Sequence, residues 1–308
     1  MDHARLLLLA GLWSSSFLFM RITAPVLGGT LTAALRVLIG AASLAVLLPL
    51  LGVRLSFGKH LRATLLLGIV NSGIPVLMYA LAARVLPAGY SAILNATTPL
   101  MGTIIGAAFF AERVDASKIF GVVVGLVGVA VLMTEGPIVV TPSVALGIAA
   151  CLVATACYGV SDLLTRRWIT ERGGLDPKLV AFGSQMGANL LLLPFFSASL
   201  VNSPALLMTT LNSPHVLLAL LALGVGCTAW GYILFFRLVD NVGPIRVLTV
   251  TFLIPPFGVL WGVFFLHENL TWSYLPAGVL ILSALFLILR PTRKSATIAN
   301  SAPRPPAP

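Results

Sequence analysis

The sequence predicts an all-α membrane protein whose ten transmembrane helices form two inverted five-helix repeats. Three observations lead to this class. The 308 residues are 58% hydrophobic and 9% charged, whereas a soluble domain carries roughly 25% charged residues. Apolar runs recur along almost the whole chain, and the connections between them alternate between rich and poor in Lys and Arg. A pattern of proline, glycine and glutamate occurs twice at a fixed spacing.

Each apolar run approaches or reaches the length of about 20 residues that a helix needs to cross a bilayer. The runs contain Gly and Pro but little strict alternation, which argues against a transmembrane barrel. A signal peptide is an alternative for the first run, but that run lacks a cleavage site of small residues and nine further runs follow. The runs cover residues 4–20, 31–51, 63–83, 89–110, 117–133, 145–165, 179–200, 215–236, 244–266 and 272–290.

The basic residues predict the orientation of these spans. Of the 19 Lys and Arg residues, sixteen fall in segments on the same side as the N-terminus, and only Arg21 and Arg84 fall on the other side. Cytoplasmic loops carry the excess of basic residues in membrane proteins. Both termini are therefore expected in the cytoplasm, with residues 134–144 outside, in a bacterial inner membrane. The net charge of +10 is a topology signal and not a nucleic-acid footprint.

The repeat is visible in "PLMGTIIGAAFFAE" (99–112) and "PPFGVLWGVFFLHE" (255–268), which match at five positions 156 residues apart. Because the repeated unit has five spans, an odd number, the second copy must be inverted. The loop "ERVDASK" after the first window has two basic residues, and its counterpart "HENLTWS" has none. We expect repeats at 1–135 and 144–290, followed by a disordered cytoplasmic tail at 291–308. Inverted repeats are typical of secondary transporters.

These features together resemble the drug/metabolite transporter superfamily, EamA-like branch. An aromatic residue precedes a small one in the first helix of each unit, at Trp13-Ser14 and Tyr158-Gly159, and proline, glycine and glutamate recur in the fourth. The resemblance covers about residues 4–290, although Ser14 stands where glycine is common. It implies a secondary transporter that moves a small metabolite, such as an amino acid, by alternating access, with export as the expected direction.

The resemblance also implies candidate site residues. It places helices 1, 3, 4, 6, 8 and 9 around a central cavity, and it implies that kinks at prolines inside the spans shape the site and the rocking of helices 3–4 against 8–9. Hydrogen bonding between helices is the alternative role for any one of the polar residues. Aromatic walls with neutral polar groups suit a small amphipathic metabolite. The expected substrate-binding residues are Trp13, Ser14, Asn71, Tyr79, Asn95, Tyr158 and Trp230, and the expected kinks are at Pro99, Pro255 and Pro256.

Charged residues inside the spans are also candidates. Arg36 lies about five residues into the second run, roughly 8 Å deep, where it either reaches out to the headgroups or binds an anionic group such as a substrate carboxylate. We therefore count it among the substrate-binding residues. Asp162 is expected to pair with Arg166, four residues later. Glu112 and Glu268 are expected to bond exposed amides of a neighbouring helix.

Alternative functions are a channel, a receptor-like membrane scaffold and, least favoured, a membrane enzyme. The four histidines are far apart in sequence, the three cysteines lie inside apolar runs, and GxSxG, HExxH and nucleotide-binding loops are missing from the sequence. No catalytic residue, cofactor or metal is therefore expected. The expected partners are a small-molecule substrate and lipids, and not nucleic acid. Monomer and homodimer both remain open. Packing between helices of one chain is the favoured role of the small-residue spacings, and Gly121–Gly128 is the best candidate for the alternative, a dimer face.

Overall fold

A computed structural model describes residues 2–112, 114–134, 141–202, 208, 212–247, 249–269 and 272–289. Within these ranges the regular structure is entirely helical, as expected for a chain whose backbone polar groups must be satisfied without water. The predicted tail at 291–308 lies outside the described residues. The elements are α1 (Asp2–Leu50), η1 (Gly58–His60), α2 (Leu61–Gly68), η2 (Ile69–Gly73), α3 (Ile74–Ala82), α4 (Ala88–Asn95), α5 (Thr98–Phe109), α6 (Ala116–Thr134), α7 (Pro142–Trp168), η3 (Thr170–Arg172), α8 (Pro177–Asn202), α10 (Pro214–Leu221), η4 (Ala222–Trp230), α11 (Gly231–Val242), α12 (Pro244–Val247), α13 (Val250–Leu266) and α14 (Tyr274–Leu289).

The first two predicted runs belong to one helical segment that a glycine interrupts. α1 has 49 residues, or roughly 75 Å at about 1.5 Å per residue, against a hydrocarbon core of about 30 Å. Gly28 has φ 77° and ψ 156°, so the helix is broken there. Only glycine adopts such a conformation readily. The two halves of α1 are therefore separate helices joined at Gly28.

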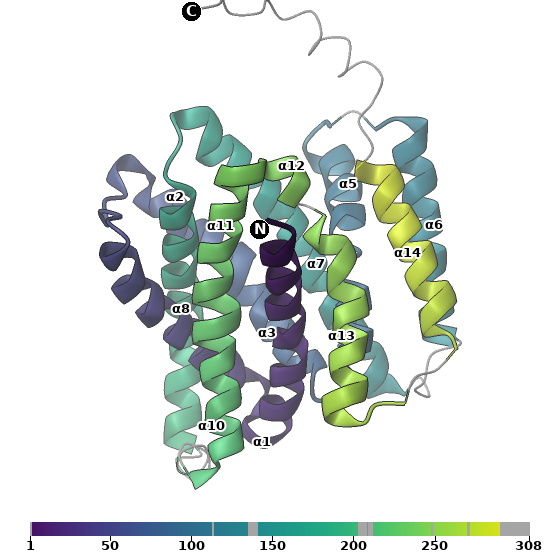
Figure 1. Cartoon of the computed structure of the whole chain (residues 1–308), viewed down its shortest axis with the longest axis horizontal. Helices are drawn as coiled ribbons and strands as arrows, with labels where there is room; N and C mark the ends of the chain where they lie inside the picture. Colours follow the sequence, from purple (N-terminus) through teal and green to yellow (C-terminus); the bar gives the residue numbers. More distant parts are fainter. Residues whose placement is uncertain are drawn as a thin grey trace, which may run out of the picture.

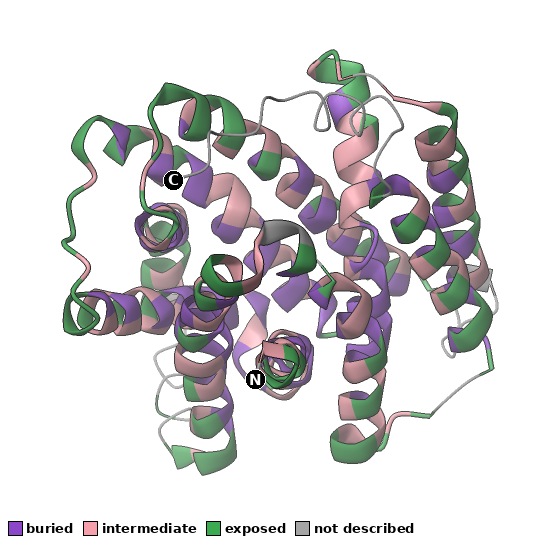
Figure 2. Cartoon of the chain, turned by 45° about the horizontal axis from the view of Figure 1, so that its top comes forward, coloured by how far each residue is buried: buried purple, intermediate pink, exposed green. Residues whose placement is uncertain are grey.

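Six helical stretches are long and apolar enough to cross a membrane, and three described helices are shorter but apolar. Exposed residues lie on helices from both halves of the chain (Figure 2). Large apolar residues are among them, including Leu50, Phe109, Phe264 and Phe286. Such a surface suits contact with lipid. The six stretches are Asp2–Leu50, Gly58–Ala82, Ala88–Phe109, Pro142–Arg172, Pro177–Val201 and Pro214–Val242, and the shorter helices cover Ala116–Leu132, Val250–Leu266 and Tyr274–Leu289.

The helices form two flanks around a middle group. α2, α8, α10 and α11 lie on one side, α5, α6 and α14 on the other, and α1, α3, α7 and α13 between them (Figure 1). α6 packs along α14 through its small residues. A Cβ on Gly121 would stand 2.9 Å from Ile288, and one on Gly128 would stand 2.8 Å from Ile281. The same chain covers this stripe, as expected from packing within one chain, and the alternative that Gly121–Gly128 forms a dimer face was wrong.

The two matching sequence windows end in the same backbone structure. The Glu112 and Glu268 amides each donate to the carbonyl oxygen of the glycine six residues earlier, at 3.0 and 3.1 Å. The preceding residues, Ala111 and His267, have positive φ angles of 54° and 53°. A left-handed residue with a bond across six positions is a common way to end a helix. The repeated Gly…Glu spacing thus encodes a helix end.

A second feature recurs at the same spacing. η2 (Ile69–Gly73) and η4 (Ala222–Trp230) are both π-helical, and a shift of 156 residues carries η2 to 225–229, inside η4. Each lies in the third predicted span of its repeat. π-helical segments are rare and are found mostly at functional sites. The side chains around η2 and η4 are therefore candidates for the functional site.

The three prolines predicted to kink helices occupy different positions in them. Pro255 and Pro256 lie inside α13. Pro99 lies in the first turn of α5, where a missing N–H costs nothing. The chain leaves helical structure at Ala96–Thr97, between α4 and α5. The kink expected at Pro99 is therefore a break between two helices.

Candidate functional site

Polar side chains from α8 and α11 meet those of η2. Gln185 of α8 donates from Nε2 to the Ser72 hydroxyl oxygen at 3.0 Å, and both side chains are buried. Tyr232 of α11 lies near the side chains of Asn71, Ser72 and Gln185. Asn189, one turn after Gln185, donates from Nδ2 to a backbone carbonyl of α1 at 3.2 Å. We call Asn71, Ser72, Gln185 and Tyr232 the polar cluster.

Arg36 borders the polar cluster. Its guanidinium lies near Tyr232, and also near Tyr158 of α7 and Cys227 of η4. The described Asp and Glu side chains form four ion pairs, and none of these involves Arg36. A guanidinium among neutral side chains in a membrane protein is expensive unless an anion or water reaches it.

The guanidinium of Arg36 points into the bundle. Its Nη1 donates to Met20 Sδ at 3.4 Å, and Met20 is only 1% exposed. Eight residues separate Arg36 from the break at Gly28, which corresponds to roughly 12 Å along the helix. Arg36 is thus deeper than the sequence predicted, and its contact with Met20 does not fit a side chain that reaches for the headgroups.

Three predicted site residues lie together beside the break between α4 and α5. The Tyr79 hydroxyl donates to Asn95 Oδ1 at 2.9 Å. The Tyr79 ring stacks on Tyr158, with centroids 6.4 Å apart, and packs edge-on against Phe17 at 5.3 Å. Tyr79 is 3% exposed. This arrangement joins α3, α4 and α7 through two aromatic rings and one amide.

Trp13 and Ser14 take part in helix packing. The Ser14 hydroxyl oxygen accepts a hydrogen bond from Trp261 Nε1 of α13 at 3.0 Å, and Ser14 is fully buried. Trp13 packs on Phe235 with centroids 5.3 Å apart. Ser14 therefore serves the contact between α1 and α13, while Trp13 lies between α1 and α11.

Trp230 is more exposed than the other predicted site residues that the contacts above describe. Its side chain is 50% exposed, although it lies in η4 beside residues of the site. Sequence reasoning missed Tyr232, two residues later, and Ser72, next to Asn71. Each carries a hydroxyl group and lies within two residues of a predicted site residue in the third span of its repeat. That proximity is the signal that could have identified both residues. It also missed Trp261, which lies between the repeated glycines of α13.

Three other charged residues, Glu268, Glu112 and Arg166, are engaged near the helix ends. Glu268 accepts hydrogen bonds from the amides of Ala88 and Gly89, at 2.7 and 3.4 Å, at the start of α4. This is the amide bonding expected for it. Glu112 instead pairs with Arg166 at 2.9 Å. Arg166 also pairs with Glu171 at 3.2 Å, so its predicted pairing with Asp162 was wrong.

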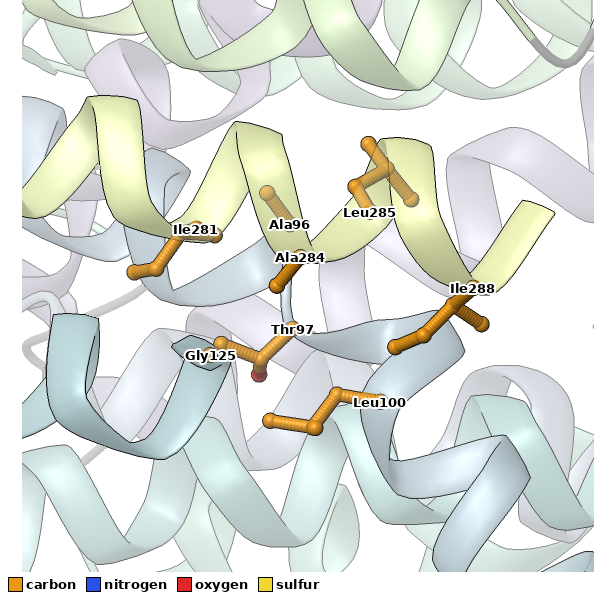
Figure 3. A pocket seen from close by; sticks show the side chains of 8 residues that line it. All are labelled: Ala96, Thr97, Leu100, Gly125, Ile281, Ala284, Leu285 and Ile288. Carbon is orange, nitrogen blue, oxygen red and sulfur yellow. The ribbon is translucent and has the colours of Figure 1, made fainter. Parts of the chain in front are cut away.

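Two small hollows lie outside the polar cluster, the first far from it in sequence and the second at its edge beside Tyr232. One, too narrow to hold a water molecule, lies between α5, α6 and α14 (Figure 3). Its only polar lining residue, Thr97, donates to the Leu94 carbonyl oxygen at 2.7 Å, so it offers a ligand little beyond apolar contact. Another, equally narrow, lies beside Tyr232 and Lys178. The first is lined by Ala96, Thr97, Leu100, Gly125, Ile281, Ala284, Leu285 and Ile288.

Several known proteins are similar along nearly the whole chain. The uncharacterized transporter YoaV of Bacillus subtilis (strain 168) is 23% identical over 281 residues, covering 90% of this chain and 92% of YoaV. An uncharacterized transporter of Archaeoglobus fulgidus is 23% identical over 280 residues, covering 90% of this chain and 95% of the relative. A solved crystal structure shares the fold with a TM-score of 0.59 and 20% identity, over 97% of this chain and 99% of that one.

The sequence of this chain also matches a family of transporters in both halves. The EamA-like transporter family matches residues 4–134 and 145–290, as the Pro…Gly…Glu repeat led us to expect. With its long apolar helices, the chain is an integral membrane protein. The similar proteins are transporters and not enzymes. The chain belongs to the EamA-like transporter family.

Proposed function

We propose that this chain is a secondary transporter that exports a small metabolite, an amino acid or a related compound, by alternating access. It has ten transmembrane helices in two inverted repeats, 1–135 and 144–290. The observation that carries the proposal is the separate family match of each half. Paired π-helical segments and paired helix ends at the 156-residue spacing support it. Inverted repeats of this kind provide two conformations that open to opposite sides.

The substrate binds, on this proposal, between the π-helical segments and the break between α4 and α5. Arg36, Asn71, Tyr79, Asn95 and Tyr158 contact it. Trp13 forms a wall of the site, and Ser14 fixes α1 against α13 through Trp261. Trp230 contacts substrate only from the exposed face of η4. Pro255 and Pro256 set the bend of α13, and Pro99 starts α5. The support is the proximity of these side chains across α1, α3, α4 and α7.

The proposed setting is a bacterial inner membrane with both termini in the cytoplasm. The distribution of Lys and Arg supports this orientation. A small-molecule substrate and lipid are the partners, and no part of the proposal requires a cofactor. The proposal does not require tight coupling of transport to protons, because few acidic residues lie within the helices.

Metabolite profiling followed by reconstitution tests the proposed function. Cells with and without the protein are compared for small molecules that accumulate outside. The compound found is then loaded into proteoliposomes, and uptake of labelled compound is measured. A transporter gives saturable uptake that speeds up when unlabelled compound is present on the far side. Uptake that neither saturates nor responds to compound on the far side indicates the alternative, a channel.

A further inference from the structure

The two glutamates that close the repeated sequence windows hold different partners. Glu268, after α13, accepts hydrogen bonds from the amides of Ala88 and Gly89 at 2.7 and 3.4 Å. Glu112, after α5, pairs with Arg166 of α7 at 2.9 Å. Both follow the same kind of helix end, with the same bond across six residues. Equivalent ends with different partners indicate that the two halves of the molecule adopt different arrangements here.

The Glu268 side of the molecule is closed between α4 and α13. A Cβ on Gly89 would stand 3.0 Å from the Val259 Cα, and one on Gly258 would overlap the Ala92 Cβ. Glycines at such positions let two helix backbones approach closely. The Glu268 carboxylate completes this contact, because it reaches from the end of α13 to the start of α4.

The Glu112 side lacks the equivalent closure. A shift of 156 residues carries Ala88 and Gly89 to Pro244 and Ile245, at the start of α12. In the part of the chain that the structure describes, α12 lies against α11 and α5 against α7, and α5 and α12 do not pack on each other as α4 and α13 do. One end of the pair formed by the fourth and ninth predicted spans is therefore closed, and the other end is not.

We propose that Glu112 exchanges Arg166 for Arg246 when the protein changes conformation, so that α5 closes on α12 as α4 closes on α13 here. This rests on the transport function proposed above, in which inverted repeats exchange their shapes. Pro244 has no N–H, so this segment offers one amide fewer than Ala88–Gly89. Arg246 is exposed two residues later, and its guanidinium supplies a charge-assisted donor instead.

The present partners of Glu112 suit such an exchange. The Arg166 side chain is 62% exposed and also pairs with Glu171 at 3.2 Å. Exposed ion pairs are weak, and Arg166 keeps one carboxylate when Glu112 leaves. Arg167 meanwhile donates to the Phe110 carbonyl oxygen at 3.1 Å and lies 4.7 Å from the centre of the Phe110 ring. These contacts hold the end of α5 on α7, so the two helices approach α12 together.

Paired cysteines in the full-length protein test the exchange. Gly89→Cys with Val259→Cys reports closure on the Glu268 side, because a Gly89 Cβ would stand 3.5 Å from the Val259 Cβ, within the range of a disulfide. The shift of 156 residues gives the matched pair for the Glu112 side, Thr103→Cys with Ile245→Cys. Disulfides are measured as thiols lost to a maleimide mass tag after oxidation. The three native cysteines stay in place, and each single substitution measures their contribution.

We expect both pairs to form disulfides in proteoliposomes, each at the expense of the other conformation. Arg246→Gln should lower the initial rate of forming the 103–245 disulfide by about 2–5-fold, because it removes the partner of Glu112 in the second conformation. Arg166→Gln should raise that rate by a similar factor, because it removes the partner in the present one. Arg62→Gln is the matched control, since Arg62 is an exposed arginine of α2, and it should leave both rates unchanged.

A 103–245 disulfide no more abundant than in the single-cysteine variants would overturn the inference. Rates that the Arg166 and Arg246 substitutions leave unchanged, or shift in the same direction, would overturn it as well. So would normal transport, by the 89–259 disulfide form, of the labelled compound that metabolite profiling identifies. Disulfides that form and shift as expected in a protein that transports nothing would support the exchange of partners and refute the proposed transport function.

Discussion

Two glycines that face each other at the crossing of α5 and α7 are expected to respond in opposite ways to the same substitution. A Cβ on Gly159 would stand 2.6 Å from the Gly102 Cα and 2.7 Å from the Gly102 nitrogen. Packed carbon atoms rest about 3.5–4.0 Å apart, so α5 and α7 have to separate by about 1 Å in Gly159→Ala. A Cβ on Gly102 would stand 3.5 Å from the Gly159 Cα, which is an ordinary contact.

The expected free energies follow from this difference. Overpacking against the backbone lowers the free energy of unfolding by about 1–3 kcal/mol. Replacing glycine by alanine inside a helix raises it by about 0.5–1 kcal/mol. Gly159→Ala should therefore lower the free energy of unfolding by about 1–2 kcal/mol. Gly102→Ala should leave it unchanged or raise it by up to about 1 kcal/mol. Each is the control for the other, because the two substitutions add the same methyl group at one crossing.

The melting temperature of detergent-solubilised protein, followed by fluorescence-detected size exclusion, measures the difference. About 2–4 °C per kcal/mol places Gly159→Ala several degrees below the wild type and Gly102→Ala at or above it. Equal losses in the two variants, or a larger loss in Gly102→Ala, would refute the reasoning from backbone contact.

Four further outcomes are expected. Glu268→Gln should lower the free energy of unfolding by about 1–3 kcal/mol, because the amides of Ala88 and Gly89 lose a carboxylate acceptor; an unchanged melting temperature would contradict this. Tyr79→Phe should reduce transport in proteoliposomes while lowering stability by no more than about 1.5 kcal/mol, since it removes one hydrogen bond to Asn95, and normal transport would remove that bond from the mechanism. Asn95→Leu should impair transport more than Trp230→Ala, because Trp230 is 50% exposed; the reverse order in uptake assays with matched amounts of folded protein would exclude this ranking. A reporter fused after Arg293 should be active in the cytoplasm, and activity only in the periplasm would reverse the topology.

The sequence predicted features that depend on local pattern. The repeated glycine and glutamate correctly marked equivalent helix ends, because a bond across six residues needs only its own segment. The apolar runs marked where helices lie for the same reason, although α1 continues past the first run up to the break at Gly28.

The choice of partner across helices was harder to predict. Glu112 and Glu268 occupy equivalent positions, yet one pairs with Arg166 and the other with the amides of α4. Ser14 belonged to the expected site, but Trp261 occupies its hydroxyl. Such contacts depend on the rotation and tilt of neighbouring helices, which an apolar run does not specify. Asn71, Tyr79, Asn95 and Tyr158 remain predictions as substrate contacts.

Helix irregularity in this chain has two chemically opposite forms. At Pro255 and Pro256 the backbone lacks two N–H donors. In η4 the turn is wider but every residue keeps its N–H, and the Thr228 hydroxyl adds a further donor to the Leu223 carbonyl oxygen at 2.9 Å. One kind of bend leaves the backbone short of donors, and the other leaves it with one to spare. In a solvent without hydrogen bonds to offer, only the second kind can change shape by exchanging one backbone partner for another.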